Sequence, residues 1–499
     1  MSQPLLIGVD GGTESLRVGV YTLSGEELAS ASAAYETVFP ASGQAEQNPE
    51  DWWRALCTAL PEAMKKADAA AGDIAAITLD TTCCTVCFLD AKKRPLRPSL
   101  LWMDVRAGQQ ATQVLDTGDD ALKINNGGHG PVSAEWMIPK SLWVKENQPA
   151  LYDAAETVCE YQDYLNYRLT GIMTASANNT GVRWHFHHHA EGAPVSLLEK
   201  LGASELAQKW PQTVLAPGEI VGPLTQTAAQ ALHLNTSIPV VQGGADAFIA
   251  MAGMGVIRPG DLALVTGSSH LHLGVTDKPL YAKGMWGAYS DVLRRGSSVV
   301  EGGQTSTGSV INWFRRTLAP DASYHELDEE ALSAPPGCDG VTAQDHFQGN
   351  RTPYTDAASR GAFTGLSLTH TRGHLFRALL ESIAYGARLI IETMSDNGVP
   401  IENVVACGGV TRSPVWTQIH ADIIGSPVKL AAAACAPALG SAMFGAIGAG
   451  HYDGLDEAAE NMVRFKSTIE PNPSAHEAYH PYFERYKSAY GALRTIGSL

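Results

Sequence analysis

The feature of this sequence that most constrains its fold is a short pattern that occurs twice. Residues 9–20 read VDGGTESLRVGV and residues 265–275 read VTGSSHLHLGV. Each has an apolar strand, a turn of small residues and a second strand that ends in Gly-Val, which predicts a β-hairpin. Two such hairpins far apart in the chain predict two domains of related architecture, although so short a match also arises by chance in β-rich chains.

The first turn carries groups that suit a phosphate and a cation. Its amide and hydroxyl donors belong to Gly11, Gly12, Thr13 and Ser15. The glycines have no Cβ, so a bulky anion can approach their backbone amides, and Asp10 lies close enough to hold a cation. The second turn has Thr266 in place of Asp10 and offers only hydroxyl and amide donors. Two facing turns of this kind would grip a polyphosphate from both sides; an ordinary polar hairpin turn is the alternative.

Length, composition and charge exclude several classes of protein. The chain has 499 residues, 44% hydrophobic and 17% charged, enough for a large core and two or more domains. Its formal charge of -17 disfavours a nucleic-acid surface, which needs clustered Lys and Arg. No apolar run reaches the roughly 18 to 20 residues that span a bilayer, and Asp10 interrupts the N-terminal apolar run before it forms a signal peptide. We therefore expect a cytoplasmic protein without a membrane or nucleic-acid partner.

The eight cysteines fit a reducing compartment, because they lack the regular spacing of a disulfide framework. Cys84 and Cys87, in TTCCTVC, have the spacing of a redox or zinc pair, but no second pair follows at zinc-finger distance, which favours core packing. A second cluster, in RWHFHHHAEGAP, contains His185, His187, His188 and His189. A solvated loop is favoured there over a metal site, because the flanking Gly and Pro offer no scaffold for a coordination shell. Whether the segments Cys83–Cys87 and His185–His189 bind anything is left open.

The order of expected elements is that of an α/β protein. In the first 110 residues, apolar runs alternate with turns and with one amphipathic helix near 49–70; these runs are 5–9, 16–23, 74–79 and 84–89. A helical region is expected over about 134–170, followed by a polar stretch to about 195. Prolines punctuate 211–239, which is interpreted as a connection into a second domain rather than regular structure.

A second aspartate lies at the start of an expected helix, a position that suits either a catalytic base or a helix cap. In IPVVQGGADAFIAMAG, a strand over 238–241 and two glycines precede Asp246 at the head of an apolar helix. As a helix cap this carboxylate would contribute about 1 kcal/mol. As a general base it would accept a proton from an attacking hydroxyl, with its ionised form favoured by the helix dipole.

A third glycine-rich turn lies near the C-terminus. VVACGGVTRSPVW predicts a strand over 404–407, then Gly408 and Gly409, then a helix from Pro414. The glycine pair lets a flat group such as adenine or ribose lie against the backbone, or it serves tight strand-to-helix packing. The sequence contains no Walker-type loop, protein-kinase loop or Rossmann fingerprint, so any nucleotide must be held by the hairpin turns.

These residues and motifs resemble the FGGY carbohydrate kinases, of the actin, hexokinase and Hsp70 superfamily. The specific C-terminal signature of the family is matched by GAFTGLSLTHTRGHLFRALLE at 361–381, and the other signature is approached by KSLWVKEN at 140–147. Ser141 departs from the second pattern, where a large apolar residue is usual. GNRTP at 349–353 and EGGQTSTGSVINWF at 301–314 are similar to the ribulokinases of the family. The resemblance covers nearly the whole chain.

The resemblance implies two ribonuclease H-like α/β domains that flank a nucleotide and sugar cleft. Residues 1–245 would include the sugar-binding part and residues 246–499 the ATP-binding part. Asp246 matches the catalytic base and Asp10 the magnesium-side aspartate. The residues matching the two phosphate motifs and the adenosine motif are Gly12, Thr13, Ser15 and Arg17, Gly267 and Ser268, and Gly408, Gly409 and Ser413. The residues expected to contact the sugar are Trp102, Asp104, Arg106, Lys140 and Glu301.

The implied activity is phosphorylation of a small sugar by ATP with Mg²⁺, with a ketopentose such as ribulose as the first candidate and a primary hydroxyl as the acceptor. A kinase of xylulose, erythritol or glycerol would use the same machinery. A noncatalytic sugar or nucleotide sensor is a rival of another class, disfavoured by the presence of both aspartates, and metal storage by the His and Cys clusters is a weaker one. A homodimer is possible.

Overall fold

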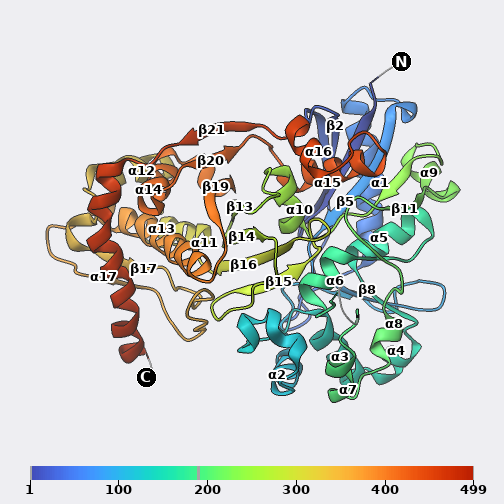
Figure 1. Cartoon of the computed structure of the whole chain (residues 1–499), viewed down its shortest axis with the longest axis horizontal. Helices are drawn as coiled ribbons and strands as arrows, with labels where there is room; N and C mark the ends of the chain where they lie inside the picture. The colour runs from blue at the N-terminus through green and yellow to red at the C-terminus, as the bar shows by residue number, and fades with distance from the viewer. Residues whose placement is uncertain (1–2, 188–191, 498–499) are drawn as a thin grey trace.

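A computed structural model describes residues 3–187 and 192–497 (Figure 1). Two large β-sheets organise the chain, one from its first half and one from its second. Figure 1 shows the blue and green elements of the first half mainly on the right, and the yellow to red elements of the second half mainly on the left. No helix among the described residues has the length and apolar character needed to cross a membrane.

The first sheet has six strands in the order β11-β12-β5-β1-β2-β3. Strands β1, β2 and β3 are antiparallel neighbours, β5 and β12 run parallel to β1, and β11 is antiparallel to β12. The bounds are β1 Leu5–Gly11, β2 Ser15–Thr22, β3 Glu27–Ala34, β5 Ile74–Thr81, β11 Ile220–Pro223 and β12 Pro239–Val241.

The second sheet, with seven strands in the order β15-β16-β14-β13-β19-β20-β21, repeats this arrangement. Its antiparallel part is β13, β14 and β16; β19 and β20 continue parallel to β13, and β21 is antiparallel to β20. The bounds are β13 Gly260–Thr266, β14 His270–Thr276, β15 Trp286–Ser290, β16 Ser298–Gln304, β19 Ile401–Gly408, β20 Val428–Ala431 and β21 Phe465–Ile469. The two hairpins recognised in the sequence occupy equivalent places, so their match reflects shared architecture.

Local sequence explains the first sheet and its covering helix. On β2, Leu16 and Val18 are fully buried and belong to the same hydrophobic cluster as Trp52 of helix α1 (Pro49–Lys66). Asn48 caps α1 by accepting a hydrogen bond from the backbone N–H of Glu50, and proline at the first helical position suits the helix start. The apolar side chains that alternate along β2 therefore pack against those that recur about every 3.6 residues along α1.

Further elements complete each half. In the first half a small sheet, β4-β7-β6-β8, and several helices pack beside the large sheet. Their bounds are β4 Glu46–Gln47, β6 Val86–Leu89, β7 Ser99–Leu100, β8 Thr157–Glu160, α2 Gly108–Asp116, α3 Met137–Asn147, α4 Pro149–Ala154, α5 Tyr161–Thr170, α6 Ala177–Arg183, α7 Val195–Lys200, α8 Leu206–Lys209 and α9 Gln226–Leu232. In the second half they are α11 Gly308–Leu318, α12 Tyr324–Ser333, α13 Arg372–Asp396, α14 Pro414–Ile424, α16 Leu455–Met462 and α17 Pro473–Gly497.

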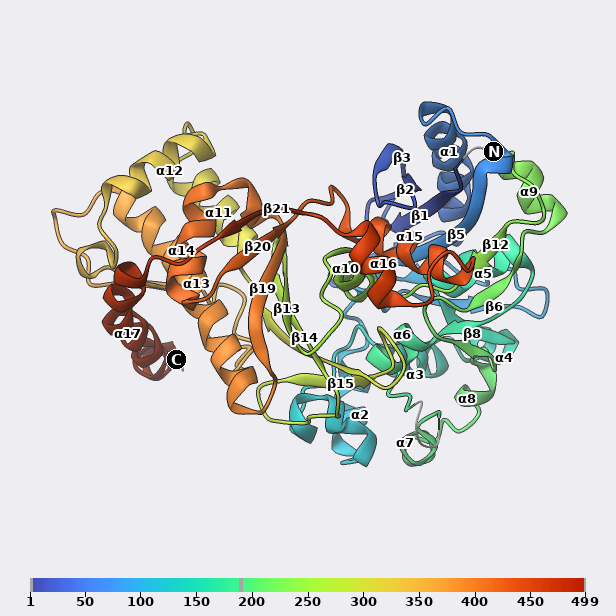
Figure 2. The same cartoon turned by 45° about the horizontal axis from the view of Figure 1, so that its top comes forward.

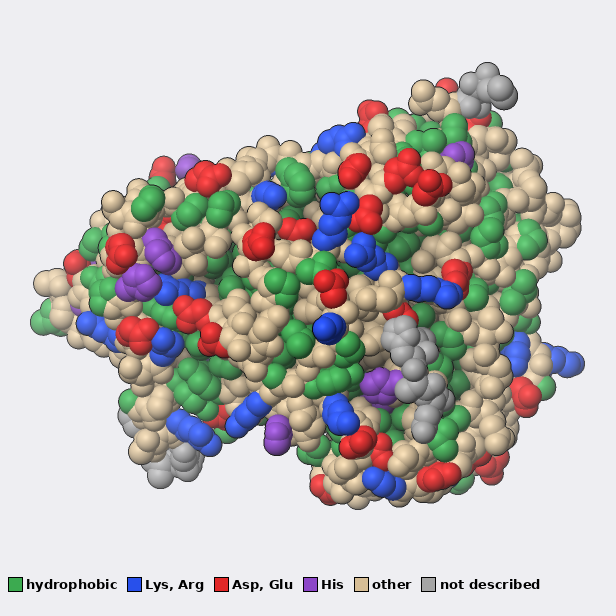
Figure 3. Space-filling view, viewed as in Figure 1, with side chains coloured by type: hydrophobic (Ala, Val, Ile, Leu, Met, Phe, Trp, Pro, Cys, Tyr) green, Lys and Arg blue, Asp and Glu red, His purple; other side chains and the backbone are tan. Residues whose placement is uncertain are grey.

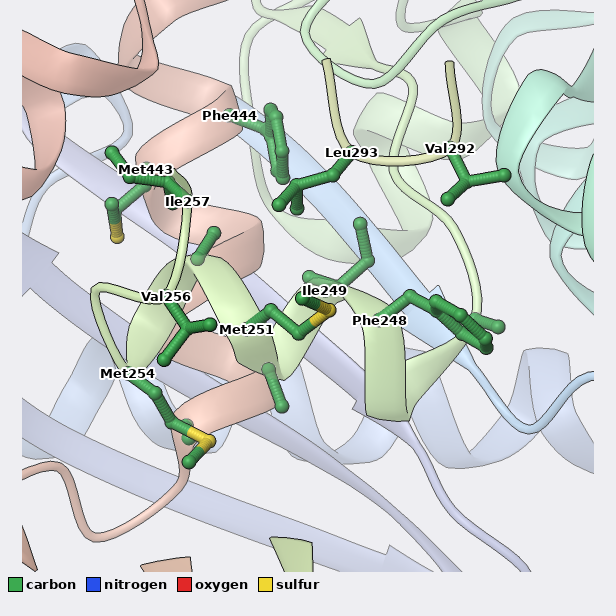
Figure 4. Close-up of a cluster of buried hydrophobic side chains, with 14 of the residues drawn as sticks. Phe248, Ile249, Met251, Met254, Val256, Ile257, Val292, Leu293, Met443 and Phe444 are labelled. Atoms are coloured by element: carbon green, nitrogen blue, oxygen red, sulfur yellow. The ribbon is translucent and has the colours of Figure 1, made fainter. Parts of the chain in front are cut away.

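Helices α10 (Asp246–Gly253) and α15 (Ala436–Gly448) pack together and join the two halves. Both views show α15, drawn in orange-red, beside the blue strands of the first sheet (Figures 1 and 2). The core around these helices, part of which is drawn in Figure 4, includes Leu6 of the first sheet and Leu273 of the second. A hydrophobic core shared by both halves therefore surrounds the start of α10.

Glycines set how closely these elements approach. A Cβ on Gly8 of β1 would lie 2.0 Å from the backbone carbonyl oxygen of Ala438 in α15. A Cβ on Gly440 would lie 2.1 Å from the carbonyl oxygen of Ile249 in α10. Because both obstacles are backbone atoms, neither can move aside cheaply, and these contacts require glycine.

We expect Gly8→Ala to lower the midpoint temperature of unfolding by several degrees, because the methyl group forces α15 away from β1 at a cost of about 1–3 kcal/mol. Gly72→Ala is the matched control, since a Cβ at that position meets nothing within 4 Å. Differential scanning calorimetry of both variants measures the effect. Equal midpoints for Gly8→Ala and the control would contradict this account of the contact.

Two expectations about elements need correction. The stretch 211–239 is not merely a connection, because it contains β11, α9 and the start of β12. The helical region over 134–170 is interrupted by β8, and the polar stretch after it contains α6. In both cases tertiary packing overrode a local pattern that composition alone suggested. The two strands expected across 74–89 are confirmed as β5 and β6, which belong to different sheets.

The expectation for one cluster of possible metal ligands is confirmed, and the expectation for the other is wrong in part. The expected core packing of Cys84 and Cys87 is confirmed, because both are buried in hydrophobic clusters. The solvated loop expected around the histidines is wrong for His185, whose buried ring bonds through Nε2 to Oδ1 of Asn125 at 2.8 Å. His188 and His189 lie outside the described residues. Within the described residues, no group of three or more His, Cys, Asp or Glu is placed to hold a metal ion.

Candidate active site

Two aspartates lie side by side at the ends of neighbouring parallel strands. Asp10 of β1 is paired in register with Asp80 of β5. One Asp10 oxygen, Oδ2, accepts a hydrogen bond from the thiol of Cys435 at 3.4 Å, and Oδ2 of Asp80 accepts one from the hydroxyl of Ser441 at 2.7 Å. Burial raises the pKa of both carboxyls, and for Asp80 the negative charge of Asp10 raises it further. This edge of the sheet therefore concentrates acidic groups that a cation would stabilise.

Asp246 begins α10 and reaches the same region. The strand β5 ends beside it, since the N–H of Thr81 donates to the carbonyl oxygen of Gly244 at 3.2 Å. Oδ1 of Asp246 accepts a hydrogen bond from the N–H of Ala247 at 2.6 Å. Burial, followed by the negative charge of Asp10, raises the pKa of Asp246 to about 7. The chain thus brings together two carboxylates from distant positions, and one of them is set near neutral pH, where a general base works best.

The first glycine turn is held by a hydrogen bond within the turn and by hydrogen bonds from two other segments of the chain. Gly12 donates its N–H to the carbonyl oxygen of Ser15 at 3.0 Å, and the hydroxyl of Tyr35 donates to the carbonyl oxygen of Gly12. The hydroxyl of Thr13 accepts a hydrogen bond from the indole N–H of Trp102 at 3.0 Å. A Cβ on Gly11 would lie 2.9 Å from the Tyr161 hydroxyl oxygen, so glycine there has a packing role.

The second turn is exposed and is tied to the third. The exposed residues Gly267 and Ser268 lie at its tip, where the N–H of Gly267 donates to the carbonyl oxygen of Ser269 at 2.9 Å. The hydroxyl of Thr266 donates to the carbonyl oxygen of Cys407 at 2.6 Å and accepts from the N–H of Val410 at 3.1 Å. The expected phosphate turn and the expected adenosine turn therefore form one connected surface.

The two glycines of the third turn have different roles in packing. A Cβ on Gly408 would lie 1.9 Å from the carbonyl oxygen of Thr266, and the residue has a φ of 91°. Close packing alone therefore requires glycine at this position. A Cβ on Gly409 would meet nothing within 4 Å, so its exposed backbone is open to a flat ligand.

Ser413 and Arg17 already have partners within the protein. The hydroxyl of Ser413 donates to Oδ2 of Asp328 at 2.7 Å and accepts from the N–H of Trp416 at 3.1 Å, which caps α14. The guanidinium of Arg17 lies 2.8 Å from Oε1 of Glu27. Contacts from either side chain to a nucleotide stay predictions.

The expected sugar residues divide into exposed and buried groups. Trp102 is exposed, with 37% of its surface accessible. Lys140 is fully buried and donates to the carbonyl oxygens of Cys84 and Leu101. Asp104 is fully buried as well and binds the N–H of Ala45 at 2.7 Å. We infer that Lys140 and Asp104 hold the loops that carry Trp102 and the thiols, instead of meeting bulk solvent themselves.

Arg106 and Glu301 take part in ion pairs. Arg106 contacts Asp104 and also Glu46, at 2.7 Å in each case. Glu301 of β16 pairs with Arg183 at 2.9 Å and with Arg351. Burial opposes ionisation of Glu301, but the two arginines outweigh it and lower its pKa to about 2. Glu301 is therefore a permanent anion that joins elements from both halves of the chain.

Sequence reasoning missed Asp80 and Arg183. Asp80 had a usable signal, because parallel neighbouring strands end at the same edge of a sheet and an aspartate after an apolar strand was visible in IAAITLD. Arg183 had none, since its bond to Glu301 joins positions far apart in the chain. Only the packing of α6 against β15 and β16 reveals it.

Two sheets with the same strand arrangement, with glycine turns and an acidic cluster where the two halves meet, identify two ribonuclease H-like domains of the actin and hexokinase fold. Family models for the N-terminal and C-terminal domains of the FGGY family of carbohydrate kinases match residues 5–253 and 262–449. The chain belongs to the FGGY family of carbohydrate kinases. It is a sugar kinase, and membership of this family makes ATP its phosphoryl donor.

The names of individual relatives refer to different sugars or polyols. A ribulokinase of Geobacillus thermodenitrificans is 30% identical over 97% of this chain and 94% of the relative, and a xylulose kinase of Bacillus subtilis is 28% identical over 99% and 98%. The crystal structure of xylulose kinase from Rhodospirillum rubrum is 30% identical, with a TM-score of 0.89 over 99% of this chain and all of that one. A Plasmodium falciparum glycerol kinase with ADP shares the fold, with 18% identity and a TM-score of 0.86 over 98% of each chain.

Proposed function

We propose that this chain transfers the γ-phosphoryl group of ATP to a primary hydroxyl of a ketopentose, with ribulose as the first candidate. The observation that carries the proposal is the meeting of Asp10, Asp80 and Asp246 at the junction of the two domains. The ribulokinase relatives and the ribulokinase-like segments at 301–314 and 349–353 support the choice of sugar.

In this mechanism Asp246 accepts the proton of the attacking hydroxyl. Phosphoryl transfer needs little covalent help beyond this, because positioning and neutralisation of charge do most of the work. The backbone amides next to Gly12 and Gly267 in the two turns are the proposed donors to the phosphates, since the N–H groups of these two glycines already donate to Ser15 and Ser269. The open backbone at Gly409 is the proposed adenosine contact. Closure of the two domains on the substrates would exclude water and so limit ATP hydrolysis.

The acidic cluster suits Mg²⁺ that arrives with the nucleotide. Magnesium is usually held by one or two carboxylates together with waters and substrate phosphates, so a cage of three protein ligands is not needed. Asp10, with Asp80 directly beside it, is the residue that would hold the ion. When bound, Mg²⁺ neutralises charge on the phosphates. Asp10 would position that ion next to Asp246.

A panel of ribulose, xylulose, erythritol, glycerol and gluconate, with ADP formation measured by a coupled assay, tests the choice of substrate. We expect the highest kcat/KM for ribulose, because a site built from hydrogen bonds rejects analogues that leave its groups unpaired. A clear preference for xylulose would replace ribulose without changing the chemistry. Absence of sugar-dependent ADP formation with every candidate would favour the noncatalytic sensor.

We expect Asp10→Asn to raise the Mg²⁺ concentration required for half-maximal activity by about tenfold or more, since it removes a charged ligand. Titration of activity with Mg²⁺ at saturating ATP measures this change. Asp120→Asn is a suitable control, because Asp120 is highly exposed. An unchanged Mg²⁺ requirement in Asp10→Asn would place the cation elsewhere.

The domain boundary between 245 and 246, the homodimer and the cytoplasmic location stay predictions. The N-terminal family model ends at residue 253, and the C-terminal one begins at residue 262.

On the face shown in Figure 3, acidic and basic side chains are interspersed.

A further inference from the structure

Two cysteines lie next to each other in the loop that follows β5. Cys83 and Cys84 come shortly after Asp80, and their sulfur atoms are 3.7 Å apart. Cys84 is buried, whereas Cys83 is partly exposed. Both are free thiols. A partly exposed thiol thus lies within contact distance of a buried one, a few residues after Asp80 in the chain.

The surroundings give the two thiols different chemistry. Burial raises the pKa of the Cys84 thiol, so this sulfur stays protonated. Cys83 is partly exposed to solvent, whereas Arg183 interacts with both thiols. Of the conditions that make a thiol reactive, solvent access is the one that separates the two cysteines. Cys83 is therefore the sulfur that an oxidant reaches, and Cys84 is placed to react with it next.

A bridge between adjacent cysteines is strained and hence easily reversed. Consecutive Cα atoms are about 3.8 Å apart across a trans peptide, whereas disulfides usually join Cα atoms about 4.4–6.8 Å apart. Strained disulfides have more oxidising potentials and are the labile, regulatory kind. Cys84 already has a φ of 64°, an unusual conformation for a residue other than glycine.

The peptide that such a bridge would distort is tied to the active site. The N–H of Cys84 donates to Oε2 of Glu160 at 2.9 Å, and its carbonyl oxygen accepts from Nζ of Lys140 at 2.7 Å. Earlier in the same loop, the N–H of Thr82 donates to the carbonyl oxygen of Gly11 at 3.0 Å. Rotation of the peptide between Cys83 and Cys84 would therefore displace the N–H of Cys84 from Glu160 and would strain the nearby peptides that bind Lys140 and the first glycine turn.

We propose that Cys83 and Cys84 form a reversible oxidation site that switches off the kinase. A hydroperoxide is the oxidant: the sulfur of Cys83 attacks the O–O bond and becomes a sulfenic acid, and the peroxide leaves as an alcohol or water. The sulfur of Cys84 then attacks the sulfenic sulfur, an S–S bond forms and water leaves with the Cys84 proton. A dithiol reductant restores both thiols. The activity loss rests on the proposed kinase function, but formation of the bridge does not.

The test treats the reduced full-length protein with hydrogen peroxide, blocks remaining thiols with iodoacetamide and analyses a protease digest by fragmentation mass spectrometry. We expect the peptide with Cys83 and Cys84 to lose two hydrogen atoms and to remain unalkylated at both sulfurs. Sugar-dependent ADP formation should fall by about tenfold or more and return with dithiothreitol, because small displacements in an active site have large effects. A peptide that stays alkylated at both positions would overturn the proposal, whether or not the protein is a kinase.

Variants in which one cysteine at a time is replaced show which thiol causes the loss of activity. Cys83→Ser should keep its own untreated activity after peroxide, and Cys84→Ser should accumulate a sulfenic acid at Cys83 that dimedone traps. Cys87→Ala controls for a bridge between Cys84 and Cys87, and Cys435→Ser controls for the thiol beside Asp10. Both controls should remain as sensitive as the unmodified chain. Equal sensitivity of Cys83→Ser, or resistance of Cys435→Ser, would show that oxidation acts elsewhere.

Discussion

Asp246→Asn is expected to lower sugar phosphorylation by about 10²–10⁴-fold while leaving nucleotide affinity within about twofold of the unmodified protein. The amide keeps the shape of the carboxylate but cannot accept a proton. Its neighbour Ala247 donates a hydrogen bond to Oδ1, and an amide oxygen can still accept that bond. Coupled ADP detection measures turnover, and calorimetric titration with ADP measures affinity. Near-normal turnover in this variant would remove Asp246 from the mechanism.

The pH dependence provides an independent check of the same role. Because burial and the charge of Asp10 raise the pKa of Asp246 to about 7, kcat/KM should rise with pH up to about 7 and then level off. A pH profile that stays flat from 5.5 to 8 would contradict this assignment.

Ionisation of Asp246 also lowers the stability of the folded protein. The unfolded carboxyl ionises near its ordinary pKa of 3.8 and the folded one near 7, so this group lowers stability as pH rises between those values. Asp246→Asn removes the penalty and should unfold at an equal or higher temperature than the unmodified protein at pH 8. Inactivity of the variant would then reflect lost chemistry and not lost structure.

Acid sensitivity is the second large effect we expect, and it comes from three histidines inside the second domain. His270 and His272 on β14 and His420 on α14 are buried, and the rings of His270 and His420 have centroids 5.8 Å apart. Burial lowers the pKa of all three, to about 3 for His272 and about 4 for His420. The unfolded chain binds protons at these positions below about pH 6.5, whereas the folded chain does not.

The contribution of these three histidines to stability should therefore be complete above about pH 6.5 and fall as the pH decreases, opposite in sign to the contribution of Asp246. At pH 5 the loss amounts to about 2 kcal/mol for each histidine. Thermal unfolding followed from pH 8 to 5 measures this slope. His272→Leu should make the slope shallower by about one proton, whereas the exposed His129→Gln should leave it unchanged. Equal slopes in the two variants would show that acid sensitivity arises elsewhere.

Much of the fold was predictable because its signals are local. Each hairpin depends on neighbouring apolar residues and a small-residue turn, so both could be located from the sequence at β1–β2 and β13–β14. Asp10 and Asp246 could be chosen for the same reason, since Asp10 lies near the end of a strand and Asp246 begins a helix. The elements within 211–239 could not be predicted, because short strands gain their stability from partners elsewhere in the chain.

The site was predictable only in part. Lys140 and Asp104 were expected to contact the sugar; the fold buries both in hydrogen bonds to backbone groups, and their contact with a sugar stays a prediction. Burial depends on which loops pack over a side chain, and residue type alone does not disclose it. The adjacent thiols and the burial of Cys84 could be predicted from the sequence, but the partial exposure of Cys83 could not.

By itself, then, the sequence determined the two hairpins, the family and the choice of Asp10 and Asp246 as candidate site residues. Tertiary structure decided that Asp80 stands beside Asp10, that α15 of the second half packs against the first sheet, and that Glu301 joins Arg183 and Arg351. Strands and turns follow from interactions between neighbours in the chain. A cluster of charges drawn from distant segments exists only after the core has closed and removed water from around them.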